Sequence, residues 1–231
     1  MISKSLLVPK GAGRDFFLVG KRGIWIPFLL TRSLPDKIYF FMALPLFEQL
    51  QLKGINHLEH PLEAGEYEDC QFTNCNLEGI LLTGFRFSNC VFKDCNLSLA
   101  EVHQTAFRSV QMIACKLLGI HFEDCVPFGW ELIFKDCQLD NSFFSEMNLQ
   151  GSRFEGCSLR QVDFTGADLK KIRFHQCDLQ NALFENCQLY ETDFRTAYHY
   201  TFDPAKNRLK KTRFSREGLE GLLRSFDIIV D

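Results

Sequence analysis

The chain has 231 residues, which suits one large domain or two small ones. It carries 26 Lys and Arg against 29 Asp and Glu, a formal charge of −3, and this near balance argues against a polybasic nucleic-acid binder and against a disordered acidic tail. Two counts are unusual. The 24 Phe residues require burial, and 10 Cys would ordinarily indicate a disulfide scaffold or a metal site.

Residues 1–64 show no regular pattern and are predicted to form an N-terminal extension, either packed on the rest or disordered. Residues 1–22 contain no apolar core of signal-peptide length, so we expect a cytoplasmic protein. The most apolar stretch, 23–47, is interrupted by Arg32, Pro35, Asp36 and Lys37. Neither half therefore reaches the roughly 20 residues that a membrane-spanning helix needs, and no membrane association is predicted.

From Tyr67 onward an apolar residue recurs every five positions, a period that fits neither a helix nor a strand. The first run is Phe72, Leu77, Leu82, Phe87, Phe92, Leu97, Val102, Phe107, Met112, Leu117 and Phe122. After a phase slip of two residues within 123–133, the second run is Phe134, Leu139, Phe144, Leu149, Phe154, Leu159, Phe164, Leu169, Phe174, Leu179, Phe184, Leu189 and Phe194, with Leu209 and Phe214 still in phase. Such a chain turns a corner every five residues and points one side chain inward in each unit.

A second inward position lies two residues before each of these. It holds small or apolar side chains, and all ten Cys fall on it: Cys70, Cys75, Cys90, Cys95, Cys115, Cys125, Cys137, Cys157, Cys177 and Cys187. The other three positions of each unit are mostly polar and should face solvent. With four corners per turn, side chains twenty residues apart would stack. This predicts one Phe ladder through Phe134 and Phe154 and another through Phe144 and Phe164 on the opposite side.

The tandem pattern resembles the pentapeptide-repeat family, whose unit is a small residue, a polar residue, Leu or Phe, and two polar residues. The matching units include CNLEG at 75–79, VDFTG at 162–166, ADLKK at 167–171 and CDLQN at 177–181. The resemblance implies an all-β solenoid, a right-handed quadrilateral β-helix, over residues 65–214.

Residues 215–231 depart from the repeat and predict a helix followed by a short strand. Ser215 suits the helix start, and Leu219, Leu222, Leu223 and Phe226 form an apolar stripe ahead of Ile228 and Val230. The segment is expected to cap the last coil. It is also similar to the C-terminal segment of the Qnr quinolone-resistance branch of the family, which implies a homodimer formed through these residues.

The interruption at 123–133 contains Pro127, Phe128, Trp130 and Glu131. One interpretation is a bulged corner whose Trp130 packs on the coil. The other is a projecting loop that contacts a protein partner through Phe128 and Trp130.

Resemblance to the Qnr branch implies a non-catalytic bacterial protein that mimics DNA, binds DNA gyrase or topoisomerase IV and protects it from quinolones, without binding nucleic acid directly. Residues 66–214 contain 20 acidic and 16 basic side chains, a net of −4, which supports such mimicry weakly. The alternative is a scaffolding module that presents polar faces to an unknown protein. A basic run closes the repeat: Lys206, Arg208, Lys210, Lys211, Arg213 and Arg216.

No catalytic, cofactor or metal site is predicted. A four-thiolate zinc site at Cys70, Cys75, Cys90 and Cys95 would have a spacing that the five-residue repeat itself produces. Ala, Val, Ile and Ser stand at equivalent positions, so the site requires small volume and not sulfur. We therefore expect free, buried thiols in place of metal ligands or disulfides.

Overall fold

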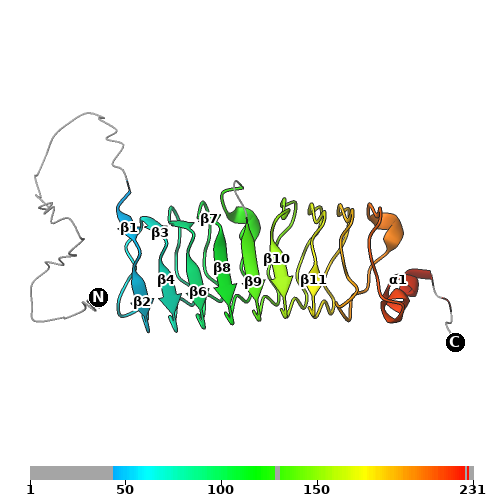
Figure 1. The fold of residues 1–231 in the computed structure, drawn as a ribbon, viewed down its shortest axis with the longest axis horizontal. Helices are drawn as coiled ribbons and strands as arrows, with labels where there is room; N and C mark the ends of the chain where they lie inside the picture. The colour runs from blue at the N-terminus through cyan, green and yellow to red at the C-terminus, as the bar shows by residue number, and fades with distance from the viewer. Residues whose placement is uncertain (1–43, 128–130, 227, 229–231) are drawn as a thin grey trace, which may run out of the picture. The chain divides into compact units, whose positions relative to one another are not determined.

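The computed structural model describes residues 44–127, 131–226 and 228, and these form a coil of short parallel strands closed by a small helix (Figure 1). The strands are β1 (Leu46–Glu48), β2 (Gln51–Lys53), β3 (Glu66–Glu68), β4 (Gln71–Thr73), β5 (Arg86–Ser88), β6 (Val91–Lys93), β7 (Ala106–Arg108), β8 (Val110–Ile113), β9 (Leu132–Lys135), β10 (Arg153–Glu155) and β11 (Phe174–His175). The helical pieces are the 3₁₀ turns η1 (Phe122–Asp124), η2 (Pro204–Lys206), η3 (Glu217–Leu219) and η4 (Arg224–Phe226) and the α-helix α1 (Glu220–Leu223).

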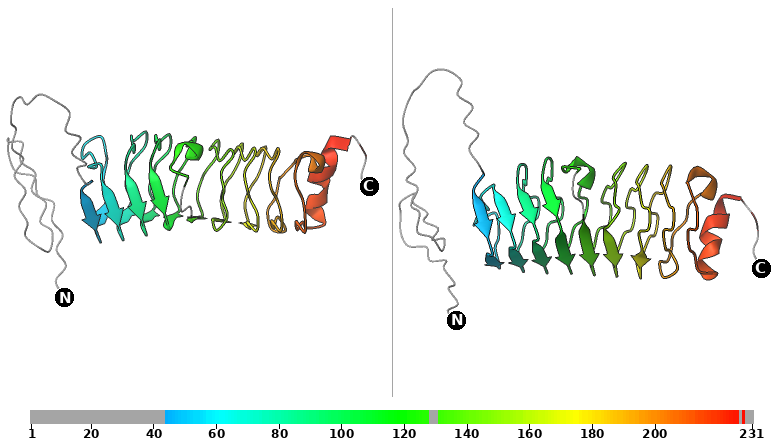
Figure 2. Two further views of the ribbon diagram at one scale, coloured as in Figure 1. Left: turned by 90° about the horizontal axis from the view of Figure 1, so that it is seen from above. Right: turned by 45° about the horizontal axis from the view of Figure 1, so that its top comes forward.

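The strands belong to two parallel sheets on adjacent sides of the coil. One has the order β1-β3-β5-β7 and the other β2-β4-β6-β8-β9-β10-β11, so each strand pairs with the strand one coil away (Figure 2). The remaining two sides are joined by single parallel bridges, such as Asn76 with Asn96 and Asp163 with Leu183. The predicted all-β solenoid of pentapeptide units with a C-terminal helix is therefore confirmed.

A tight turn at each corner explains the five-residue period. Between Phe164 and Ala167 the Ala167 N–H donates to the Phe164 carbonyl at 2.9 Å, and Gly166 between them has φ +73°. The same left-handed conformation recurs at equivalent corners, for example at Asp69 and Asn181. Gly, Asn and Asp tolerate this conformation best, which is why they are frequent two residues after the inward Leu or Phe, although other residues such as Gln104, Glu146 and Lys171 adopt it too.

The interior is built from the predicted aromatic rows. Phe134 and Phe154 are stacked at 5.2 Å between ring centroids, and Phe144 and Phe164 are stacked at 5.5 Å on the opposite side. The two rows meet edge to face, as Phe144 and Phe154 do at 89°. Offset stacking within a row and edge contacts between rows are the two favoured aromatic geometries, and the rings of both rows are fully buried.

The coil begins earlier than predicted. β1 and β2 lie inside the segment 1–64 that we predicted to be a non-repeat extension, yet they pair in register with β3 and β4. Phe47, Leu52 and Leu62 occupy the inward positions of this first coil. The pattern is hidden in the sequence because His57 stands where Leu or Phe is expected. Of the apolar stretch 23–47, residues 23–43 lie outside the described part of the chain, and residues 44–47 lead into and form part of β1.

The predicted phase slip of two residues is present and can be located. Val126 N–H donates to the Thr105 carbonyl, as in an ordinary coil, whereas Leu132 pairs with Val110. The two additional residues therefore lie between 126 and 132. The register on both sides of this point is otherwise continuous, with Met112 of β8 opposite Phe134 of β9.

Candidate interaction surfaces

The coil places a concentration of carboxylates on one of its four sides. This side surrounds the inward row formed by Leu82, Val102, Phe122, Phe144, Phe164 and Phe184. We call it the acidic face, and its carboxylates are Glu63, Glu101, Glu123, Asp124, Glu146, Asp163, Glu185 and Asp203. Over the described stretches of this side, from residue 61 to 206, Lys206 is the single Lys or Arg, and its Nζ pairs with Glu185 at 2.8 Å.

The acidic face is hollowed next to the interruption. A shallow groove of about 600 Å³ is lined by Glu123, Glu146 and Asp163 together with Pro127 and Met147. Glu123 Oε1 lies 3.0 Å from His121 Nδ1, while its Oε2 is enclosed and has no hydrogen-bond partner. The groove therefore combines carboxylates with a small apolar floor, a combination that suits a cationic side chain of a partner protein.

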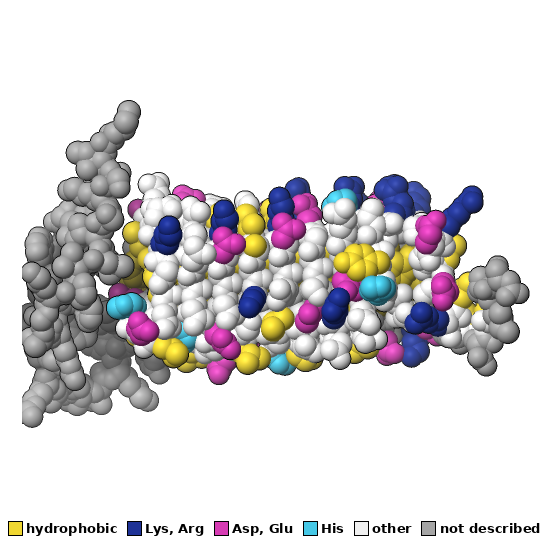
Figure 3. All heavy atoms as spheres, turned by 90° about the horizontal axis from the view of Figure 1, so that it is seen from below, with side chains coloured by type: hydrophobic (Ala, Val, Ile, Leu, Met, Phe, Trp, Pro, Cys, Tyr) yellow, Lys and Arg dark blue, Asp and Glu magenta, His cyan; other side chains and the backbone are white. Residues whose placement is uncertain are grey.

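The opposite side of the coil is the outer surface of the seven-stranded sheet, and it carries the reverse charge. We call it the basic face, with Lys53, Lys93, Lys135, Arg153, Arg173, Arg195, Arg213 and Arg216. Four carboxylates are interspersed, at positions 94, 136, 155 and 193. Figure 3 shows Lys and Arg side chains crowded along the upper edge of the molecule, most densely toward the C-terminal end of the coil.

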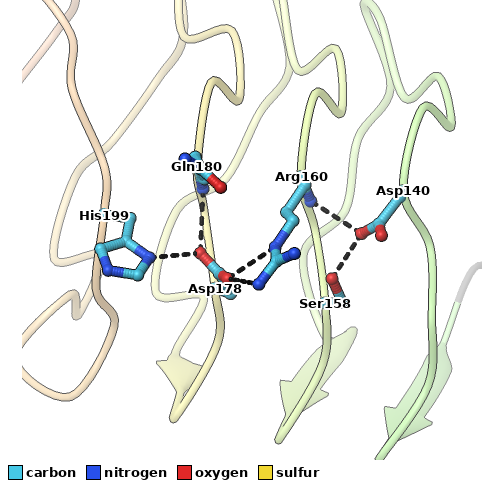
Figure 4. A network of polar contacts seen from close by, with 6 residues as sticks. All are labelled: Asp140, Ser158, Arg160, Asp178, Gln180 and His199. Atoms are coloured by element: carbon cyan, nitrogen blue, oxygen red, sulfur yellow. Dashed lines mark hydrogen bonds and ion pairs between the residues drawn. The ribbon is translucent and has the colours of Figure 1, made fainter.

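A network of polar contacts lies on the side between these two faces (Figure 4). Asp178 is buried, and its Oδ2 accepts hydrogen bonds from the Arg160 guanidinium at 2.7 Å. Its Oδ1 lies 2.9 Å from His199 Nδ1 and accepts from Gln180 N–H. Burial acts to raise the pKa of Asp178, but the hydrogen bonds from Arg160 and His199 outweigh it, so the pKa lies below its usual value. The network links successive coils and is structural in character.

The C-terminal segment is a cap, as predicted, but its apolar stripe is divided. Leu222 is 7% exposed and belongs to the core, whereas Leu219, Phe226 and Ile228 are 44%, 56% and 56% exposed. Leu223 is half-buried. Ser215 Oγ accepts from Gly218 N–H at 3.1 Å, in agreement with the predicted helix start. Val230 lies outside the described residues, and so does the predicted strand beyond Ile228.

The structure does not distinguish between the two interpretations of the interruption at 123–133. Phe128 and Trp130, the two aromatic residues proposed to pack on the coil or to contact a partner, lie outside the described residues. Pro127 and Glu131 on either side of them are exposed. Both interpretations of this loop therefore remain predictions.

All ten Cys are free and buried at the second inward position, as the repeat predicts. Most of these thiols contact backbone carbonyls of the preceding coil: Cys157 Sγ, for example, donates to the Phe134 carbonyl at 3.4 Å, and Cys187 Sγ to the Phe164 carbonyl at 3.0 Å. Among the described residues, no group of three His, Cys, Asp or Glu is arranged to hold a metal ion. In that same part of the chain, no helix is long and apolar enough to cross a bilayer.

The two charged faces were missed by the sequence reasoning, which considered only a net charge of −4 and a terminal basic run. The signal was present, because charges that share a side recur every twenty residues. The charged faces can be found in the sequence by assigning each charged residue to one of the four sides of the coil. Residues after the interruption at 123–133 must be shifted by two positions in this assignment.

Comparison with known proteins agrees with this architecture. Residues 70–108 match a family model described as pentapeptide repeats (8 copies), and residues 130–184 match one described as a pentapeptide repeat region. No curated protein matches the chain.

Two solved structures share the fold. QnrB1, a plasmid-mediated fluoroquinolone resistance protein, aligns with a TM-score of 0.52 and 16% identity over 79% of this chain and 99% of its own. HetL, a pentapeptide repeat protein involved in heterocyst differentiation regulation from the cyanobacterium Nostoc sp. strain PCC 7120, aligns with a TM-score of 0.52 and 12% identity over 75% of this chain and 88% of its own. The five-residue register, the stacked inward rows and these matches identify the chain as a pentapeptide-repeat protein.

Proposed function

We propose that this chain is a non-catalytic binding protein of the bacterial cytoplasm whose acidic face occupies a basic, DNA-binding surface of a type II topoisomerase, DNA gyrase or topoisomerase IV. The observation that carries the proposal is the segregation of charge, with eight carboxylates and one paired lysine on one side of the rod. Likeness in fold to a fluoroquinolone resistance protein supports it.

The spacing of carboxylates on the acidic face can be compared with the spacing of phosphates in DNA. Coils are spaced about 4.8 Å apart, so the face presents roughly one carboxylate per 4.8 Å of rod. A single DNA strand presents one phosphate per about 3.4 Å, and the duplex one per about 1.7 Å. The face therefore resembles one sparse phosphate row, and we expect binding that weakens steeply with salt.

A supercoiling assay with gyrase tests the proposal. We expect micromolar protein to inhibit supercoiling or to restore it in the presence of ciprofloxacin, and the variant Glu101→Lys, Asp124→Lys, Glu146→Lys to raise the required concentration about tenfold or more. The matched control, Glu48→Lys, Glu68→Lys, Glu191→Lys, changes the net charge equally on another side and should behave like the wild type. If the wild-type protein neither inhibits gyrase nor protects it from ciprofloxacin, the topoisomerase is excluded as the partner.

Within the same proposal, the chain acts as a homodimer joined through its C-terminal cap. Leu219, Phe226 and Ile228 remain exposed on the cap. Burying apolar side chains of this size against a second copy of the chain would be favourable. Light scattering at tens of micromolar should report a dimer, and Leu219→Glu with Phe226→Glu should yield a folded monomer. Leu222 is unsuitable for this test because it is part of the core.

The second candidate is a scaffolding module whose partner is not a topoisomerase. The exposed positions of Pro127 and Glu131, which flank Phe128 and Trp130, favour it. A pull-down that returns another protein, and loses it when Phe128 and Trp130 are both replaced by Ala, would support this function. A partner retained by that double variant would exclude the loop as the contact.

A further inference from the structure

The acidic and basic faces are matched in most coils, though not in all. Six coils place a cation on the basic face and a carboxylate on the acidic face about ten residues later in the chain. The pairs are Lys53 with Glu63, Lys93 with Glu101, Lys135 with Glu146, Arg153 with Asp163, Arg173 with Glu185, and Arg195 with Asp203. The coil between the first two pairs, residues 66–85, lacks a charged side chain on both faces. The coil of β8 places Glu123 and Asp124 on the acidic face and no cation on the basic face, and Arg213 and Arg216 on the basic face have no carboxylate in a following unit of the acidic face.

The two members of each pair lie on opposite sides of the rod, so they do not neutralise each other within one molecule. Lys93, Lys135 and Arg153 are exposed, as are Glu101 and Glu146, and none of these side chains has an ion-pair partner within the described part of the chain. Two pairs are partly compensated: Arg173 and Arg195 both approach Asp193, and Glu185 pairs with Lys206. In the central coils Lys93, Lys135 and Arg153 share the basic face with Asp94, Asp136 and Glu155, so the excess positive charge of this face lies at Lys53, Arg173, Arg213 and Arg216.

We propose that the basic face docks on the acidic face of a second copy of this chain. A copy displaced sideways without rotation keeps its coils level with those of the first, because both rods have the same spacing of about 4.8 Å per coil. Six of the eight cations then lie level with the carboxylate of the equivalent coil, and Arg213 and Arg216 have none opposite. The contact is heterologous, since each copy offers one face and leaves the other free, so it generates side-by-side arrays and not a closed dimer.

The composition of the basic face favours this occupant over nucleic acid. Its eight cations are interleaved with the carboxylates Asp94, Asp136, Glu155 and Asp193, which repel a dense phosphate backbone. The acidic face of this chain is less densely charged than a phosphate backbone. It repeats at the pitch of the basic face, and both faces lack charge in residues 66–85, whereas the coil of β8 carries Glu123 and Asp124 opposite no cation. Complementary charges of this kind fix partner and register.

Association through exposed ion pairs is weak for each pair and is screened by salt. We therefore expect self-association at low ionic strength that decreases about tenfold or more in its association constant when NaCl rises from about 50 mM to about 300 mM. The contact covers the acidic face, so it would compete with any other partner of that face. The inference does not rest on the topoisomerase proposal.

Sedimentation velocity tests the contact in a Leu219→Glu, Phe226→Glu background, which removes the proposed cap dimer. Two charge-reversed variants are compared. One carries Lys93→Glu, Lys135→Glu and Arg153→Glu on the basic face, and the other carries Glu101→Lys, Glu146→Lys and Asp163→Lys on the acidic face. Circular dichroism and thermal melting check that each is folded.

The expected result is that the parent associates at low salt and that each reversed variant alone stays monomeric. An equimolar mixture of the two variants should associate again, because each then presents the face that the other lacks. A monomeric parent at hundreds of micromolar in low salt, or a mixture that stays monomeric, would overturn the proposal. So would binding of a short DNA duplex that is lost on reversing the basic face, if the parent does not self-associate.

Discussion

At the scale of single residues, Phe164 shows how the core depends on the aromatic rows. Its ring is fully buried, stacked against Phe144 and Phe184 and in edge contact with Phe154 and Phe174. Phe164→Ala should lower the free energy of unfolding by about 3–5 kcal/mol, because the neighbouring coils are fixed and cannot close the cavity. Urea unfolding measures this loss.

The control is Cys157→Ala, on the adjacent side of the same coil as Phe164. Ala167 and Ala182 already occupy equivalent positions, so this change should cost only about 1 kcal/mol. Equal losses for the two variants would mean that the inward geometry described above is incorrect.

Asp178 gives the molecule an acid-sensitive contact. Its pKa is lower in the folded chain than in the unfolded one, where an Asp titrates near 3.9. The stabilisation is therefore fully present above about pH 5, and it is lost as the pH falls through the folded pKa. Asp178→Asn should destabilise the protein by about 1–3 kcal/mol at neutral pH, because Arg160 loses a charged acceptor.

Urea unfolding of Asp178→Asn and the wild type across this pH range measures the effect. The difference in unfolding free energy should shrink as the pH falls through the pKa of Asp178 in the folded chain. A difference that does not change with pH would show that the carboxylate charge contributes nothing. Asp163→Asn is a suitable control, because Asp163 lies on the equivalent outward position without a salt bridge among the described side chains.

At the scale of elements, α1 is held against the last coil by close backbone contact. A Cβ added at Gly221 would collide with the Tyr200 carbonyl oxygen, which cannot move without disturbing the coil. Gly221→Ala should therefore detach the cap, although Ala favours helix formation by about 1 kcal/mol over Gly. Amide hydrogen exchange should accelerate in residues 217–226 while exchange in the central coils is unchanged.

Glu220→Ala is the matched control, because Glu220 is exposed and adjacent in the same helix. It should leave exchange in the cap unaffected. If amide exchange in residues 217–226 stays slow in Gly221→Ala, the close contact between Gly221 and the Tyr200 carbonyl is not as described.

At the scale of the whole molecule, the ten thiols report on opening of the entire coil. They are buried, which denies a reagent access. Burial raises the pKa of the Cys187 thiol to about 12, whereas the hydrogen bond with Cys90 lowers the pKa of the Cys70 thiol to about 7, so burial and not protonation is what protects Cys70 near neutral pH. A thiol reagent at about pH 7.5 should react with the native protein only at the rate at which the coil opens, and with all ten thiols in guanidinium chloride. Rapid reaction of several thiols in the native protein would contradict the described burial.

The repeat could be predicted because its determinants are local. The inward Leu or Phe, the small residue two positions earlier and the corner Asn, Asp or Gly all lie within one five-residue unit, and each has its own steric reason. The first coil was missed because a single residue, His57, replaces the inward apolar side chain. The cap helix was predicted, but which side of its stripe is buried was not, because that depends on contact with Tyr200.

By itself, the sequence determined the inward register, the phase slip and the use of ten Cys as packing residues. These follow from side-chain size at fixed spacing along the chain. The spacing of about twenty residues carried the signal for the charged faces, but only the tertiary structure showed which charges lie together, since Glu101 and Glu123 or Arg153 and Arg173 become neighbours when coils stack. A net charge of −4 over the repeat hid this arrangement, because summing over all four sides cancels the basic face against the acidic one.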